Sequence, residues 1–396
     1  MGCLSVSVQL VSLNPELQQL EDEGYHVEVV NEHLVVFGIP YLDAEGNLQF
    51  GDLISKIDFV DAGRTTIGRP SDHQVFFRGG APYNSDGTHV RLSGGPNPLF
   101  VSEQIVADRS MSNKPPSGFY DTLYQKIDTY ITYISTPAVN KFPGTTPRRG
   151  IEYKALQQNS PLKLPDTLSA RGGFVDLSDK LRGLRIAIVG LGGTGSYILD
   201  FVCRTHVAEI HLFDDDDYKV HNVFRTPGGF IPEEFGRSKV DVLATRYGDV
   251  HGGIIAHQVR VDSETASLLE GLDFCFVAVD SGPSRGEIAR LLSGLAIPSV
   301  DVGMGLYRSG PGLNGFVRVC SVMPDKTEHL LQTPYLPAAD PADNEYRHQA
   351  QIGELNAFNA ALAVIAFKRH YGFFDSIDPP EGSFYEIADG TISYPM

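Results

Sequence analysis

One stretch near the middle of the chain most constrains its fold: Arg185-Ile-Ala-Ile-Val-Gly-Leu-Gly-Gly-Thr-Gly-Ser196. An apolar run of strand length ends in a cluster of glycines, a helix-like segment follows at 197–206, and a second apolar run, Glu209–Phe213, ends in Asp214. This order predicts a β-α-β nucleotide-binding unit. The glycines let backbone N–H groups approach a phosphate or ribose at the helix N-terminus, where the helix dipole favours negative charge. The residues after Asp214 then indicate which reaction the nucleotide site serves.

The remainder of residues 166–396 continues this pattern. Apolar runs alternate with helical segments, which predicts an α/β fold with a doubly wound, Rossmann-like sheet. A final helix at Gln351–Tyr371 is apolar on more than one face, so we expect it in the core or in a subunit interface. The other expected strands are Gly253–Val261, Asp273–Val279, Ile297–Gly303 and Gly315–Val322, and the other expected helices are Arg237–Tyr247, Ser263–Leu269 and Ser284–Leu295.

Residues 1–165 differ from this pattern. The full length of 396 residues exceeds one ordinary core of roughly 150 residues, so at least two domains are expected. Short apolar runs separated by Gly, Pro, Asn and Asp predict an N-terminal α+β domain rich in strands, which ends in a linker at 143–165. Its expected elements are strands at His33–Pro40, Gln74–Phe77 and Thr88–Leu92 and an amphipathic helix at Tyr120–Ile134.

The charge and the cysteines exclude several classes of function. A formal net charge of −17 argues against a nucleic-acid partner or an anionic membrane surface, because both need concentrated Lys and Arg. The sequence has no apolar run of about 18 residues and no basic start, so we expect a cytoplasmic protein with no membrane segment. Its four cysteines lie far apart without a C-x-x-C pair, and no zinc site is therefore expected.

The charged residues after Asp214 point away from a dehydrogenase. A dehydrogenase needs one acid there for the ribose and has no use for an Asn and an Arg soon afterwards. Because the carboxyl ends of the strands meet at one edge of an open sheet, these side chains are expected in one crevice around the glycine loop. They are Asp216, Asn222, Arg225 and Lys239, followed by Asp280 at a strand end and Arg285 five residues later.

That set suits a triphosphate. Arg225 and Lys239 can neutralise the β- and γ-phosphates, and Asp280 can hold Mg²⁺ that bridges phosphate oxygens. A carboxylate that attacks the α-phosphate would then meet less repulsion, and pyrophosphate could leave. For Arg225 or Lys239 alone, a solvated surface charge is the simpler interpretation; the ordered set as a whole favours the site.

These motifs resemble the adenylation domain of the ThiF/MoeB/HesA family, which includes the ubiquitin-activating enzymes. The resemblance covers roughly residues 166–372 and rests on Gly-Leu-Gly-Gly-Thr-Gly, Asp-x-Asp, Asn-x-x-Arg, the later Lys and the strand-terminal Asp. It implies that ATP lies near a loop of Gly190, Gly192, Gly193 and Gly195, that Asp214 binds the ribose with Asp216 beside it, that Asn222, Arg225 and Lys239 contact phosphates, and that Asp280 coordinates magnesium.

The resemblance also implies partners. Family members are usually homodimers in which an Arg before the first strand reaches the neighbour's ATP; Arg171 is our candidate, with Arg182 and Arg185 as alternatives. The family's substrate is the C-terminal glycine carboxylate of a ubiquitin-like protein, which becomes an acyl-adenylate. The final helix resembles that of bacterial members with an uncharacterised N-terminal domain, which occur beside ubiquitin-like and deubiquitinase-like proteins. A relation of residues 1–165 to ubiquitin-conjugating enzymes is a further hypothesis, although we find no active-site cysteine there.

The chain departs from the family at the acyl-carrying step. Many relatives form a thioester on a cysteine before the final helix, but no cysteine follows Ser321 here. Cys203 and Cys275 are expected to be buried small hydrophobes, and Cys320 is a weak candidate nucleophile. Either the enzyme stops at the acyl-adenylate, or a hydroxyl takes the acyl group as an oxyester with His329 as the base. The candidate hydroxyls are Ser321, Thr327 and Thr333, and the loop Pro324–Arg347 is expected to cover a protein tail.

Three alternatives to a ubiquitin-like substrate stay open at this point. An NAD-dependent oxidoreductase rests on the glycine loop alone. A catalytically degenerate scaffold subunit would not be expected to keep an Arg, a Lys and two acids in one crevice. Adenylation of a small-molecule or peptide carboxylate is compatible with the same fold.

Overall fold

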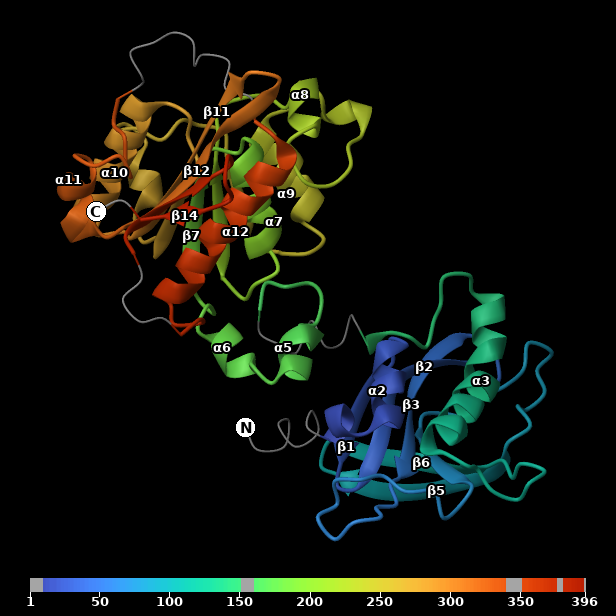
Figure 1. Ribbon diagram of the computed structural model, residues 1–396. Helices are drawn as coiled ribbons and strands as arrows, with labels where there is room; N and C mark the ends of the chain where they lie inside the picture. The colour runs from blue at the N-terminus through green and yellow to red at the C-terminus, as the bar shows by residue number, and fades with distance from the viewer. Residues whose placement is uncertain (1–9, 151–159, 340–350, 376–379, 395–396) are drawn as a thin grey trace. The chain divides into compact units, whose positions relative to one another are not determined.

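The computed structural model describes residues 10–150, 160–339, 351–375 and 380–394, without the side chains of residues 170 and 171. The chain divides into two compact units, Met1–Gln158 with Leu164–Arg171 and Asn159–Lys163 with Gly172–Met396, and each is described by itself (Figure 1). In the described part of the chain, no helix is both long enough and apolar enough to span a membrane.

The first unit is built on a six-stranded antiparallel sheet in the order β1-β2-β3-β4-β6-β5. The predicted strands at 33–40 and 74–77 are confirmed, whereas the predicted strand at 88–92 is wrong. There His89 makes only an isolated bridge to Tyr83, because Asp86 accepts hydrogen bonds from the backbone and hydroxyl of Thr88 and closes a turn. The strands are β1 (His26–Val30), β2 (His33–Leu42), β3 (Leu48–Lys56), β4 (Gln74–Arg78), β5 (Ser93–Ser102) and β6 (Ile105–Ser112).

Two helices, α2 (Pro15–Asp22) and α3 (Leu123–Lys141), share one core with this sheet (Figure 1). Helix α3 begins where Thr122 accepts a hydrogen bond from the N–H of Gln125, as N-cap residues do. Its buried residues recur at three- and four-residue spacing, which confirms the predicted amphipathic helix. These residues include Leu123, Ile127, Tyr130, Ile131 and Ile134.

The second unit is built on an eight-stranded sheet in the order β14-β13-β12-β11-β10-β7-β8-β9. Strands β11, β10, β7, β8 and β9 are mutually parallel, as the α/β prediction requires. The strands on the other side of β11 are antiparallel, which a purely doubly wound sheet does not have. The strands are β7 (Arg185–Val189), β8 (Glu209–Phe213), β9 (Ile254–His257), β10 (Phe274–Val277), β11 (Ser299–Ser309), β12 (Gly312–Val322), β13 (Gly382–Glu386) and β14 (Ile392–Ser393).

Helices cover both faces of this sheet (Figure 1). Along β7, Ile186 and Ile188 pack against α7, α9 and α12, whereas Ala187 and Val189 pack against α10. This alternation follows from the two-residue period of a strand. The predicted helix at 263–269 is only a short 3-10 turn, η2 (Ala266–Leu269). The helices are α7 (Gly193–Val202), α9 (Lys239–Tyr247), α10 (Gly282–Gly294) and α12 (Gly353–His370).

A buried ion cluster joins α10 to the strands β11 and β12. Asp301 is 1% exposed, and its carboxylate pairs with Arg285 at 3.0 Å and with Arg318. Arg285 also donates to the backbone carbonyl of Val279. The expectation that Arg285 joins the nucleotide crevice is therefore wrong, because its guanidinium is bound to Asp301 and to the backbone inside the fold.

Asp301→Asn is expected to lower the free energy of unfolding by about 3–5 kcal/mol, because two buried guanidinium groups lose their countercharge. Urea unfolding would measure this loss. Asp325→Asn is the matched control, since Asp325 is exposed in the short turn η3 (Pro324–Lys326) and should shift stability by less than about 0.5 kcal/mol. Equal effects of the two changes would contradict a central role for Asp301.

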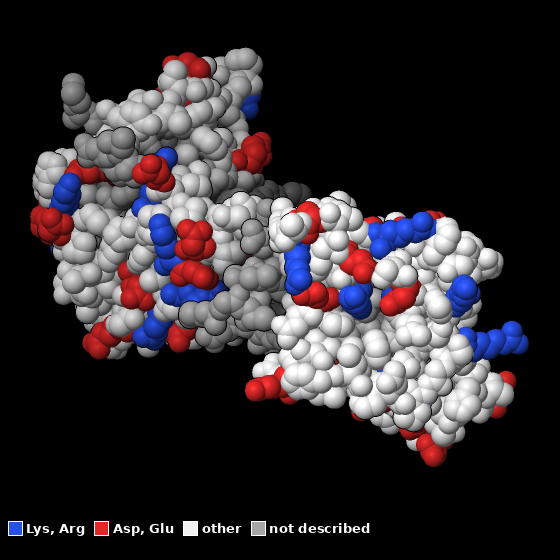
Figure 2. Space-filling view, turned by 90° about the horizontal axis from the view of Figure 1, so that it is seen from below, with Lys and Arg blue, Asp and Glu red and all other residues white. Residues whose placement is uncertain are grey.

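Charged surface residues are mixed in sign. Figure 2 shows one face of the molecule, on which Lys and Arg side chains lie beside Asp and Glu side chains. Exposed pairs of this kind contribute about 0–1 kcal/mol each, so they add little to the stability of either unit.

Candidate functional site

The glycine-rich turn joins β7 to α7 by close backbone contact. Gly190 adopts a φ of +89°, and a Cβ at this position would lie 2.6 Å from the carbonyl oxygen of Ala278. A Cβ at Gly195 would lie 1.9 Å from the carbonyl oxygen of Gly190. Both positions require glycine because the turn presses against β10 and against itself.

Gly192 differs from these two glycines. A Cβ here would meet no protein atom within 4 Å, and the residue lines the cavity described below. Gly192 is also the N-cap of α7 and supplies no side-chain cap, so it leaves the first N–H groups of that helix without the usual capping acceptor. The requirement for glycine at this position is therefore not one of packing.

Gly192→Ala is expected to leave the melting temperature unchanged and to weaken ATP binding about tenfold, because the methyl group enters the space in which the sequence predicts the phosphates. Gly195→Ala should instead lower the melting temperature strongly. Calorimetric ATP titration and thermal unfolding of both variants would check this contrast. A Gly192→Ala protein that binds ATP as wild type does would show that the nucleotide lies elsewhere.

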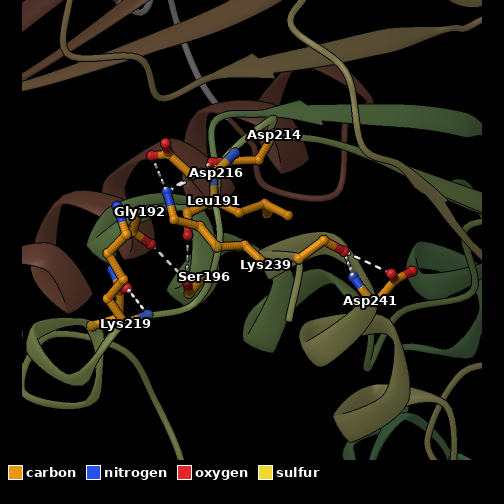
Figure 3. Close-up of polar contacts among 10 residues, drawn as sticks. Leu191, Gly192, Ser196, Asp214, Asp216, Lys219, Lys239 and Asp241 are labelled. Carbon is orange, nitrogen blue, oxygen red and sulfur yellow. Dashed lines mark hydrogen bonds and ion pairs between the residues drawn. The ribbon is translucent and has the colours of Figure 1, made fainter. Parts of the chain in front are cut away.

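Asp214 is held in place at the end of β8. Its carboxylate accepts hydrogen bonds from the N–H of Leu191 at 2.6 Å and from the N–H of Asp216 at 2.9 Å. Lys239, the first residue of α9, is buried and bridges the two acids, with Nζ 3.1 Å from Asp214 and 2.7 Å from Asp216 (Figure 3). The hydrogen bond from Lys239 lowers the pKa of Asp216. Hydrogen bonds and ion pairs thus connect the glycine turn, Asp214 at the end of β8 and Lys239 in one network.

Arg225 faces the acids of this network. Burial lowers the pKa of its guanidinium, and the nearby carboxylates of Asp280, Asp214 and Asp216 oppose that shift. Its Nε is buried without a hydrogen-bond partner among the described residues. Buried donors are normally paired, so this one is suited to an anionic ligand.

One cavity of about 260 Å³ brings these groups together at the carboxyl ends of the parallel strands. Most of the predicted site residues line it, although neither their roles nor the ligand follow from this placement alone. Residues Gly190, Gly192, Asp214, Asp216, Arg225, Lys239 and Asp280 are all in its wall.

Other predicted site residues do not line this cavity. Gly193 and Gly195 lie in the first turn of α7, outside the wall of this cavity. Asn222 is buried and accepts a hydrogen bond from the N–H of Lys219 at 2.7 Å, which caps the short helix α8 (Val220–Val223). Arg171 belongs to α5 (Thr167–Gly172), and its side chain lies outside the described part of the structure. The phosphate role of Asn222 and the role of Arg171 at a neighbour's ATP stay predictions.

Several residues of the cavity wall escaped the sequence analysis. Val259, Arg260 and Val261 follow β9, and Ser284 on α10 accepts a hydrogen bond from the Arg260 guanidinium. The carboxyl end of β9 lies at the same sheet edge as those of β7 and β8, which is the one signal that could have identified them.

A second cavity of about 190 Å³ adjoins the first. Their walls share Gly192, Ala278, Val279, Asp280 and Gln351. Beyond Asp280 the second cavity is lined by β11 and β12, where Gly303 and Gly305 make room for the side chains of Arg318 and Phe316. Its other wall residues include Thr194, Arg285, Met304, Phe316, Arg318 and Asn356.

The described residues suit magnesium at Asp280 but not a metal held by protein alone. Asp280 is exposed at the cavity wall. Within the described ranges, no group of three or more His, Cys, Asp or Glu side chains could hold a metal. Magnesium at nucleotide sites is bound through one or two carboxylates together with phosphate oxygens, and Asp280 can supply the protein's share.

The three cysteines in the described part of the chain are unsuited to carrying an acyl group. Cys203, Cys275 and Cys320 are buried, as was expected for the first two. Burial raises the pKa of the Cys320 thiol to about 12, so the thiol stays protonated at neutral pH. The hypothesis that Cys320 is a nucleophile is therefore not supported.

The candidate hydroxyls for an oxyester are also poorly placed. Thr327 is 1% exposed, and the hydroxyl of Thr333 donates to the carbonyl of Leu330 at 2.7 Å. Ser321 lines a separate cavity at the other end of β12. His329 is exposed in α11 (Thr327–Leu330). Residues 340–347 of the predicted covering loop lie outside the described residues.

Two known families match the chain. The ThiF family matches residues 168–388, which is more than half of the chain. A family described as a domain of unknown function (DUF6791) matches residues 15–167.

Individual relatives match over shorter stretches. Ubiquitin-like modifier-activating enzyme 5 of Arabidopsis thaliana is 26% identical over 100 residues, which are 25% of this chain and 23% of that protein. tRNA threonylcarbamoyladenosine dehydratase of Bacillus subtilis is 30% identical over 107 residues, which are 26% of this chain and 42% of that protein. The chain thus spans less than half the length of these relatives. Among solved structures, E. coli MccB with ATP has a TM-score of 0.43 at 16% identity, covering 56% of this chain and 66% of that chain.

Proposed function

The chain belongs to the ThiF family through residues 168–388, and from that premise we propose that it adenylates the C-terminal glycine carboxylate of a ubiquitin-like protein with ATP and Mg²⁺. One observation carries the proposal: a single cavity gathers the glycine turn, the ribose-type acid, an arginine, a lysine and a second acid. A dehydrogenase site has no need of the last three groups.

The role proposed for each residue follows from its charge. Asp214, fixed by the Leu191 amide and by Lys239, presents a carboxylate for ribose hydroxyls. Lys239 donates to Asp214 at 3.1 and 3.4 Å and to Asp216 at 2.7 Å, so its ammonium would reach a phosphate oxygen by giving up the long 3.4 Å contact. Arg225 offers its unpaired buried Nε to the same phosphates. When bound at Asp280, Mg²⁺ would supply further charge neutralisation for the phosphates.

The reaction needs no acid or base from the protein. An ionised carboxylate oxygen forms a bond to the α-phosphorus while the bond from that phosphorus to the bridging oxygen of pyrophosphate breaks. No proton moves, so the contribution of Arg225 and Lys239 is to reduce repulsion between the attacking carboxylate and the phosphates.

We further propose that the enzyme stops at the acyl-adenylate. The described thiols are buried, and the loop hydroxyls bond to backbone carbonyls or line a different cavity. A separate protein would then consume the adenylate. We retain as proposals a homodimer with Arg171 at the neighbouring site and a relation of residues 1–165 to ubiquitin-conjugating enzymes.

The test is ATP–pyrophosphate exchange with a purified ubiquitin-like protein that ends in glycine, followed by intact-protein mass spectrometry. We expect exchange that needs ATP, Mg²⁺ and the terminal glycine, and an adenylate but no acyl-enzyme. The same ubiquitin-like protein without its last glycine is the control. Tight NAD binding without ATP binding would favour an oxidoreductase, binding of neither would favour a scaffold, and exchange with a small or peptide carboxylate alone would redirect the substrate assignment.

A further inference from the structure

The side chain of Asn356, in the first turn of α12, is buried in the wall of the second cavity. It is 1% exposed, and its Oδ1 accepts a hydrogen bond from the hydroxyl of Thr194 on α7 at 2.9 Å. Its Nδ2 is buried without a hydrogen-bond partner among the described residues. Asn356 lines the second cavity, which adjoins the nucleotide cavity at Gly192 and Asp280.

The packing around this amide is close. A Cβ at Gly193 would lie 2.1 Å from Nδ2, so glycine at the start of α7 makes room for it. The same helix start has no side-chain cap. An unpaired amide donor and the positive end of a helix dipole therefore lie side by side at the cavity wall, which favours an anionic acceptor.

A carboxylate fits this position better than a phosphate of the nucleotide. Asn356 is absent from the wall of the first cavity, where Arg225 and Lys239 already serve the phosphates. In the second cavity the cations Arg285 and Arg318 share the buried anion Asp301, and Asp280 lies at the boundary with the first cavity, so these four side chains carry no net charge. A singly charged carboxylate beside one amide donor meets less repulsion there than a doubly charged phosphate would.

We propose that Asn356 holds the carboxylate that is to be adenylated, which deepens and rests on the function proposed above. Its Nδ2 donates a hydrogen bond to the oxygen that remains as the acyl carbonyl, and the other oxygen is left to form the bond to the α-phosphorus. The carboxylate enters ionised and pyrophosphate leaves with the electron pair of the broken bond, so charge and atoms balance without a proton transfer. Asn356 thus positions the acyl group and does not bind the nucleotide.

The test compares AMP with a stable mimic of the acyl-adenylate, adenosine 5′-(N-acetylglycyl)sulfamate. Wild type should bind the mimic at least tenfold more tightly than AMP. In Asn356→Ala this preference should fall to within about twofold of unity while AMP affinity stays unchanged. Asn359→Ala is the matched control, because Asn359 is equally buried one turn later on α12 and lines neither cavity; it should keep the preference even where it lowers the melting temperature.

A change in the ligand keeps the test decisive if Asn356→Ala does not fold. Replacing the acetylglycyl group by an N-propyl group removes the acyl carbonyl, and wild type should then lose about tenfold in affinity. The inference is overturned if AMP binds and the acyl mimic binds no more tightly, or if Asn356→Ala keeps the preference. Absence of AMP binding in wild type would instead overturn the proposed function itself.

Discussion

Asp280→Asn is expected to reduce ATP–pyrophosphate exchange about 10³-fold while the protein stays folded. Asp280 is exposed at the end of β10, so an isosteric amide should not change the packing. The variant loses the one negative charge that faces Arg225 from β10 and that can hold magnesium. Stabilising charge at a transferring phosphoryl group is commonly worth about 10²–10³ in rate for each group removed.

The affinity for ATP with and without Mg²⁺ isolates the cause. In wild type, Mg²⁺ should raise ATP affinity; in Asp280→Asn, ATP should bind equally in its presence and absence. Asp217→Asn is the matched control, since Asp217 is an exposed acid near the site that does not line the cavity. If exchange persisted in Asp280→Asn, this side chain would not bind the magnesium, and our assignment of the metal site would be wrong.

The parallel part of the second sheet was predictable because its information is local. Each strand is a short apolar run, and the glycine turn after β7 fixes both the strand end and the helix start. The antiparallel pairing of β11 with β12 was missed for a physical reason. The start of β11 and the end of β12 are buried in the sheet, so their apolar runs look like those of parallel strands. Only the tight turn at Ser309–Gly312 shows that no helix intervenes.

The site residues likewise fall into those that the local sequence reveals and those that it does not. Asp214 and Asp280 follow the ends of β8 and β10, where charge after an apolar run is visible in sequence, and Arg225 and Lys239 follow Asp214 in the connection to α9 and at its first residue. Asn356 could not be identified from the sequence, because one polar residue in an apolar helix forms no pattern. Its role depends on its contact with Thr194, which lies on another helix 162 residues away in the sequence. Arg285 was misread because a buried ion pair and a ligand contact use the same residue type.

Arg225→Ala is expected to lower the exchange rate by about 10²–10³-fold and to weaken ATP binding. Arg225 is partly buried, and the carboxylates that face it belong to Asp280, Asp214 and Asp216. Without the guanidinium, the three acids would repel the triphosphate. Lys239 and Arg260 would be the cations left in the described cavity wall. The variant should fold normally, since the Nε of Arg225 makes no hydrogen bond that folding could lose.

Arg225→Lys separates charge from geometry. Lysine restores the charge but not the planar fork, so we expect ATP affinity to recover largely and the exchange rate to recover only in part. Arg237→Ala is the matched control, because Arg237 lies in the same connection between β8 and α9 but outside the cavity wall. If Arg237→Ala and Arg225→Ala lowered exchange equally, the effect would come from the net charge of the molecule. A loss confined to Arg225 would instead locate the triphosphate between this side chain and the glycine turn.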